Sequence, residues 1–133
     1  MLSLWASGIG RNDEILIPQF LSPCVIDSVV RVGVPALSIS EKTKAVLLYH
    51  HWGYPQNFEA VKEVISGRNL TIVEDCAHGF WGKNNGNHIG EFGDTAILSL
   101  SKIFRMTYAG AIKVNNDRLH DDITKELTKN VSI

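Results

Sequence analysis

Short apolar runs alternate with amphipathic segments along this chain, and this alternation limits the folds that it can adopt. The runs expected to form strands are residues 14–17, 36–39, 45–49, 70–74, 96–100 and 110–114. Between several of them, apolar residues recur three and four positions apart, which indicates helices. Strands that alternate with helices favour an α/β fold with a mainly parallel sheet and flanking helices. At 133 residues, a single domain is expected.

Helix-start and turn signals agree with this pattern. Ser22 precedes a proline that suits the first position of a helix, and Asn57 and Asp117 stand where a helix cap is needed. The pair Asn85-Gly86 is typical of a two-residue hairpin turn. The sequence therefore predicts helices that begin near residues 23, 58 and 118.

Composition excludes several classes of protein. The formal net charge is −1, so nothing favours nucleic acid or a membrane surface as a partner. No apolar stretch approaches the roughly 20 residues of a membrane span. Cys24 and Cys76 are too few for a disulfide framework. We expect a cytoplasmic protein with neither a nucleic-acid nor a membrane partner.

Two ionisable residues follow neighbouring apolar runs in a pattern that suggests chemistry. Asp75 directly follows the run at 70–74, and Lys102 follows the run at 96–100. Open α/β sheets bind their ligands beyond the carboxyl ends of their strands. An acid after one strand and a lysine after the next suit pyridoxal 5'-phosphate (PLP), because the lysine forms a Schiff base and the acid faces the ring nitrogen. Glu74 should point to the opposite face and be structural.

One connection in this layout is too short. Only Ser40 to Lys44 join the runs at 36–39 and 45–49. A crossover between adjacent parallel strands needs about a dozen residues. Either these two strands pair antiparallel, or a segment is missing between Ser40 and Glu41. We favour the missing segment.

Several blocks of sequence occur together in a recognisable order. They are Gly8-Ile9-Gly10 through Pro18, Thr43-Lys44-Ala45-Val46 with His50 through Pro55, Val73 through His78, Ile89 through Ala96, and Ser99 through Lys102 with Ala109-Gly110-Ala111. In this order they resemble the DegT/DnrJ/EryC1/StrS family of PLP-dependent sugar aminotransferases. The resemblance covers nearly the whole chain.

The resemblance implies that residues 1–133 are part of the large domain of a fold-type-I PLP-dependent transferase. It also implies that about one helix is lacking between Ser40 and Glu41, and that a C-terminal small domain is absent. Family members move an amino group, typically from glutamate or a similar amino-acid donor, to a keto-sugar nucleotide. They work as homodimers, so a homodimer is expected here.

The resemblance also assigns roles to four residues. Lys102 is the expected catalytic lysine and binds the PLP cofactor, and Asp75 pairs with the protonated ring nitrogen. Ser99 would donate its hydroxyl to the cofactor phosphate, and His78 would lie close to the cofactor ring. Each has an ordinary alternative: a solvated lysine, a strand-end aspartate, a turn serine and a loop histidine.

Other interpretations of the sequence stay open or are disfavoured. The potential metal ligands His50, His51, His78, His88, Asp75 and Asp94 match no metal-binding spacing, so no metal is expected. His50 and His51 are expected to form hydrogen bonds at a strand end. The chain could also be a catalytically inactive remnant of this fold. A PLP-dependent sugar dehydratase of the same family is disfavoured, because those relatives carry histidine in place of the lysine.

Overall fold

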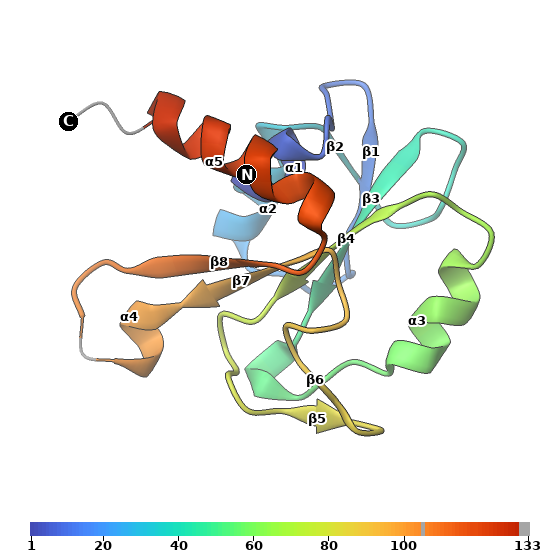
Figure 1. Ribbon diagram of the computed structural model, residues 1–133. Helices are drawn as coiled ribbons and strands as arrows, with labels where there is room; N and C mark the ends of the chain where they lie inside the picture. Colours follow the sequence, from blue (N-terminus) through green and yellow to red (C-terminus); the bar gives the residue numbers. More distant parts are fainter. Residues whose placement is uncertain (105, 131–133) are drawn as a thin grey trace.

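A six-stranded sheet forms the centre of the molecule (Figure 1). The computed structural model describes residues 1–104 and 106–130. The strands of this sheet, in spatial order, are β2 (Val34–Ala36), β1 (Glu14–Leu16), β3 (Thr43–Tyr49), β4 (Thr71–Asp75), β7 (Thr95–Ser99) and β8 (Gly110–Val114). Every neighbouring pair is parallel except β7 and β8. The predicted α/β class with a mainly parallel sheet is confirmed.

Helices cover both faces of the sheet (Figure 1). The described helices are α1 (Leu2–Ala6), α2 (Pro23–Val30), the short 3-10 helix η1 (His51–Gly53), α3 (Phe58–Ile65), α4 (Leu100–Ile103) and α5 (Asp117–Asn130). Helices α1 and α2 pack on one face, where α5 contacts α1 and β8, and α3 packs on the other. Within the described residues, no helix has both the length and the apolar character that a membrane crossing requires.

The alternation of side chains along β3 builds two separate cores. Leu47 and Tyr49 join the cluster under α1 and α2, together with Leu4 and Val29 from those helices. Leu48 points the other way and packs with residues that include Phe58 and Cys76. Because registered residues of neighbouring parallel strands share a face, Asp75 lies on the α1/α2 side with Tyr49.

The local signals are mostly confirmed. The Asn57 side chain accepts a hydrogen bond from the Ala60 amide at 3.2 Å. The hairpin of β5 (Lys83–Asn84) and β6 (Asn87–His88) turns through Asn85 and Gly86 at φ of 49° and 84°, the left-handed values that such a turn needs. Two caps differ from expectation. Ser22 makes no side-chain cap bond, and Asp117 is already inside α5.

The connection between β2 and β3 corrects one part of the predicted layout. The strand expected at 36–39 is β2 at Val34–Ala36, which includes Pro35 because an edge strand can leave an amide unpaired. Strands β2 and β3 are neither adjacent nor antiparallel, since β1 lies between them and is parallel to both. Residues 37–42 can extend roughly 20 Å. That is enough to cross two strand spacings, about 10 Å.

Candidate functional site

Asp75 is held at the carboxyl end of the central strand. It is the last residue of β4, in register with Tyr49 of β3 and Ile97 of β7. Its side chain is 5% exposed, and Oδ1 accepts a hydrogen bond from the Ala77 amide at 3.0 Å. Among the described residues, no donor reaches Oδ2. One oxygen of this carboxylate is therefore free to accept a hydrogen bond from a ligand.

A cavity of about 240 Å³ lies on the Asp75 face of the sheet. Its walls are mainly apolar, with Leu4, Val29 and Leu47 among them, and Asp75 is its one ionisable side chain. The lining residue Ser3 has a buried hydroxyl with no partner in the described part of the chain. A carboxylate beside apolar walls suits a flat ring that carries one N–H group. This chemistry is compatible with a pyridine ring, although His78, Ser99 and Lys102 do not line this cavity.

His78 lies beside Asp75, on the loop that follows β4. Its Nδ1 is 2.9 Å from the hydroxyl of Tyr49, and the two ring centroids are 5.6 Å apart. The loop approaches the backbone near Gly53 so closely that a Cβ on Gly79 would lie 2.6 Å from the Gly53 Cα. Glycine is required for this approach, which brings the His78 loop against the end of β3.

Ser99 ends the neighbouring strand β7, and Lys102 follows on the next helix. Ser99 ends β7 and, by alternation from Ile97, lies on the same face as Asp75. Its hydroxyl is 3.2 Å from that of Ser101 and makes no helix-cap bond. Ser99 therefore lies at the edge of the sheet where Asp75 lies, and the chain leaves the sheet there toward Lys102.

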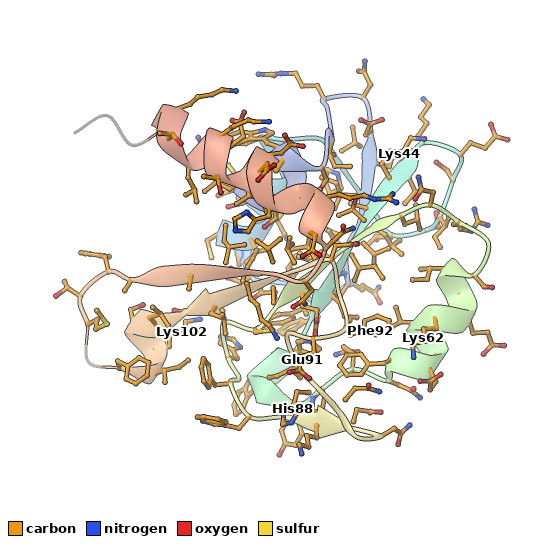
Figure 2. All side chains as sticks on the ribbon, viewed as in Figure 1. Lys44, Lys62, His88, Glu91, Phe92 and Lys102 are labelled. Atoms are coloured by element: carbon orange, nitrogen blue, oxygen red, sulfur yellow. The ribbon has the colours of Figure 1, made fainter. Side chains whose placement is uncertain are left out.

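Lys102 lies on α4, the short helix that follows β7 (Figure 2). This helix was not predicted from the sequence. The lysine is exposed, has no hydrogen bond or ion pair among the described residues, and does not line the cavity beside Asp75. Its side chain is therefore free to move, and its convergence with Asp75 on one cleft stays a prediction.

Glu74 occupies the opposite face of the sheet and is fully buried. Its Oε2 accepts hydrogen bonds from His50 Nε2 and the Gly90 amide, both at 2.8 Å. Its Oε1 accepts from the amides of Phe92, at 2.8 Å, and Gly93, at 2.7 Å. Three backbone amides thus join this carboxylate to the loop before β7, and His50 joins it to the end of β3. The predicted structural role of Glu74 is confirmed.

The same network fixes the proton of His50. Its Nδ1 accepts a hydrogen bond from the Gln56 amide at 3.2 Å, so the proton lies on Nε2 and is donated to Glu74. Burial alone would raise the pKa of Glu74, but the hydrogen bonds from His50, Gly93 and Gly90 outweigh it, and the pKa lies below its usual value. His50 is therefore a hydrogen-bonding residue at a strand end, as predicted.

His50, Glu74 and Cys76 bring ligand-type atoms within 4.8 Å of one another. However, hydrogen bonds already use both carboxylate oxygens of Glu74 and both ring nitrogens of His50. Burial, with the charges of Glu74 and Asp75, raises the pKa of the Cys76 thiol to about 12. His50 and Glu74 are therefore hydrogen-bonded to each other, and the buried Cys76 thiol near them stays protonated.

The sequence did not single out Tyr49 as a site residue. The signal was available in the alternation of the run at 45–49, which places Tyr49 on the face of Leu47. Its register with Asp75 depends on how β3 and β4 pair, which no local pattern determines.

Known proteins resemble this chain over most of its length. A GDP-perosamine synthase from Escherichia coli O157:H7 is 28% identical over 140 residues, which take in 90% of this chain and 38% of that protein. A UDP-N-acetyl-3-dehydro-alpha-D-glucosamine 3-aminotransferase from Acidithiobacillus ferrooxidans is 27% identical, over 74% of this chain and 32% of that protein. The chain thus spans well under half the length of these relatives.

Solved structures share its fold. A DegT DnrJ EryC1 StrS aminotransferase from Brucella abortus superposes with a TM-score of 0.84 at 19% identity, over 99% of this chain and 43% of that one. The ntda protein of Bacillus subtilis, solved with bound cofactor PMP, gives a TM-score of 0.78 at 21% identity, over 92% of this chain and 32% of that one. The predicted fold-type-I architecture is confirmed by these likenesses.

The family assignment rests on a match to the sequence pattern of a whole family. That pattern covers residues 36–130, from the end of β2 to the end of α5, and so includes the strand ends that carry Asp75 and Ser99. Since the match takes in most of the chain, the chain belongs to the DegT/DnrJ/EryC1/StrS aminotransferase family.

Proposed function

We propose that the whole protein is a PLP-dependent aminotransferase that moves an amino group from glutamate or a similar donor onto a keto-sugar nucleotide. The observation that carries this proposal is the free Oδ2 of buried Asp75 beside an apolar cavity, one strand away from Lys102. The names of the two curated relatives support a nucleotide-sugar substrate.

The four predicted residues would divide the work. When bound, PLP supplies an electron sink for the reacting carbon. Asp75 would hold the proton on the ring nitrogen, because an opposite charge nearby favours the charged form of the ring. His78 would pack beside the ring, and Ser99 would donate its hydroxyl to the phosphate. Lys102 would anchor the cofactor through its amine and later move the proton at the reacting carbon.

We also propose that the protein acts as a cytoplasmic homodimer and that the intact chain has an additional segment between Ser40 and Glu41, as well as a C-terminal small domain. The E. coli alignment supports the additional segment: 90% of 133 residues is about 120, whereas the alignment extends over 140. About 20 residues of that relative therefore lie opposite gaps. Ser40 and Glu41 are both exposed, so a longer connection is compatible with the observed sheet.

Trapping of the cofactor tests this function. The full-length protein should develop an absorbance band when PLP is added, and borohydride should then fix the cofactor to Lys102, as mass spectrometry of the peptides would reveal. Attachment to Lys83 or Lys113 instead would contradict the assignment of Lys102. If no absorbance band develops with PLP and borohydride attaches no cofactor, the protein is the catalytically inactive remnant.

Asp75→Ala should weaken catalysis without removing the lysine chemistry. The substitution deletes the charged partner of the ring nitrogen, and such a contact contributes about 1.5–3 kcal/mol. If all of this appears in the barrier, turnover by the full-length enzyme should fall by about tenfold to a hundredfold.

Asp75→Asn is the matched control for shape, because the amide oxygen can still accept from Ala77 while the charge is gone. It should lose nearly as much activity as Asp75→Ala. If Asp75→Asn turns over substrate as fast as the wild type at saturating PLP, the charge at this position does not contribute to catalysis.

A further inference from the structure

Tyr49 places a hydroxyl group at a fixed point beside the site. It is the last residue of β3 and is 8% exposed. Its carbonyl oxygen accepts a hydrogen bond from Gln56 Nε2 at 2.9 Å, and its ring meets that of His51 edge-on, with centroids 5.3 Å apart. Strand pairing, the Gln56 bond and ring packing thus restrain Tyr49 from three sides.

His78 has far less support of its own. It is exposed and lies on a loop, where the Tyr49 hydroxyl is the one hydrogen-bond partner of its ring among the described residues. Its other ring neighbour is His51, with centroids 6.3 Å apart. The orientation of the His78 ring therefore depends on the hydroxyl of Tyr49.

The chemistry of the pair also determines where the His78 proton lies. The titratable groups that face the pair are Asp75 on β4, His51 on η1 and Cys24 on α2. Burial, with the charges of Asp75 and Cys24, raises the pKa of Tyr49 above its ordinary value. The phenol therefore stays protonated and can donate its proton to Nδ1 of His78, 2.9 Å away. In that arrangement the proton of a neutral His78 ring lies on Nε2.

We propose that Tyr49 is a positioning residue, whose hydrogen bond to Nδ1 holds the His78 ring beside Asp75 in one orientation and one tautomer, ready to pack against the ring of a bound cofactor. The inference rests on the proposed function and deepens it, because it names what sets the geometry of His78. Tyr49 does not line the cavity beside Asp75, and its expected effect on the cofactor is transmitted by His78.

A double-mutant cycle on the full-length protein tests this role, with pyridoxamine phosphate as the probe. Tyr49→Phe removes only the hydroxyl and should raise the dissociation constant about threefold to tenfold. In a His78→Ala background, the same substitution should have no further effect, because its route to the cofactor is already lost. Tyr54→Phe is the control, since Tyr54 is 76% exposed and should bind the probe like the wild type.

Nitrogen NMR of the cofactor-free full-length protein supplies a second readout. At a pH where His78 is neutral, the wild type should show Nδ1 without a proton, and Tyr49→Phe should show a mixture of both tautomers. If Tyr49→Phe changes neither the tautomers of His78 nor the binding of pyridoxamine phosphate, the inference about Tyr49 is wrong and the proposed function is unaffected. A wild-type protein that does not bind pyridoxamine phosphate would overturn the proposed function as well.

Discussion

Lys102→Ala should abolish transamination by the full-length protein while leaving its affinity for pyridoxamine phosphate within a few-fold of the wild type. A positioned proton-transfer group contributes about a hundredfold to ten-thousandfold to rate, and the substitution also removes the amine that would anchor the cofactor. Since Lys102 is exposed and without partners in the described residues, its loss should not unfold the protein. Turnover of a keto-sugar nucleotide and titration with pyridoxamine phosphate measure the two effects separately.

Lys83→Ala is the matched control for this experiment. Lys83 is also an exposed lysine, but it lies on the β5–β6 hairpin. It should keep wild-type turnover. If Lys102→Ala keeps normal turnover as well, the assignment of Lys102 is wrong.

Glu74→Ala should cause a large loss of stability. It leaves the Nε2–H of His50 and the amides of Gly90, Phe92 and Gly93 without an acceptor in a buried site. Breaking a buried charged network costs about 3–5 kcal/mol. Urea denaturation of the full-length protein at neutral pH should reveal this loss as a lower midpoint.

A glutamate in the same loop provides the comparison. Glu91 is exposed (Figure 2), and its carboxylate forms an exposed ion pair with the Lys113 amine at 3.6 Å. Such pairs contribute at most about 1 kcal/mol, so Glu91→Ala should stay close to the wild type. A Glu74→Ala protein as stable as Glu91→Ala would mean that the loop keeps its structure without the carboxylate.

The difference between the wild type and Glu74→Ala should depend on pH. The folded pKa of Glu74 lies below its ordinary value, so the folded state binds this proton less readily than the unfolded chain. The stabilisation is complete above the unfolded pKa and is lost as the pH falls through the folded pKa. The two denaturation midpoints should therefore approach each other in acid.

The elements that the sequence predicted well are those with local causes. The Asn57 cap depends on the Ala60 amide three residues away, and the turn at Asn85-Gly86 depends on φ values that these residue types tolerate. The opposite orientation of Glu74 and Asp75 follows from the two-residue period of a strand. All of these patterns lie within one short stretch of chain.

The features that the sequence did not predict depend on pairing between distant segments. The linear pattern took β2 and β3 as neighbouring strands and did not predict that β1 lies between them. The backbone amides of Gly90, Phe92 and Gly93, which donate to the Glu74 carboxylate, lie 16 to 19 residues from it in the sequence. Tyr49 and His78 are 29 residues apart, and only the register of β3 and β4 brings them together.

The central place of β4 has a consequence for local unfolding. Its backbone is bonded to β3 on one side and β7 on the other, so its amide hydrogens can exchange with solvent only when the middle of the sheet opens. Lys102, by contrast, lies on a helix of four residues that opens at much lower cost. The acid of the proposed site thus belongs to a slow-exchanging part of the molecule and the lysine to a fast-exchanging one. A ligand held by both would slow exchange chiefly in α4.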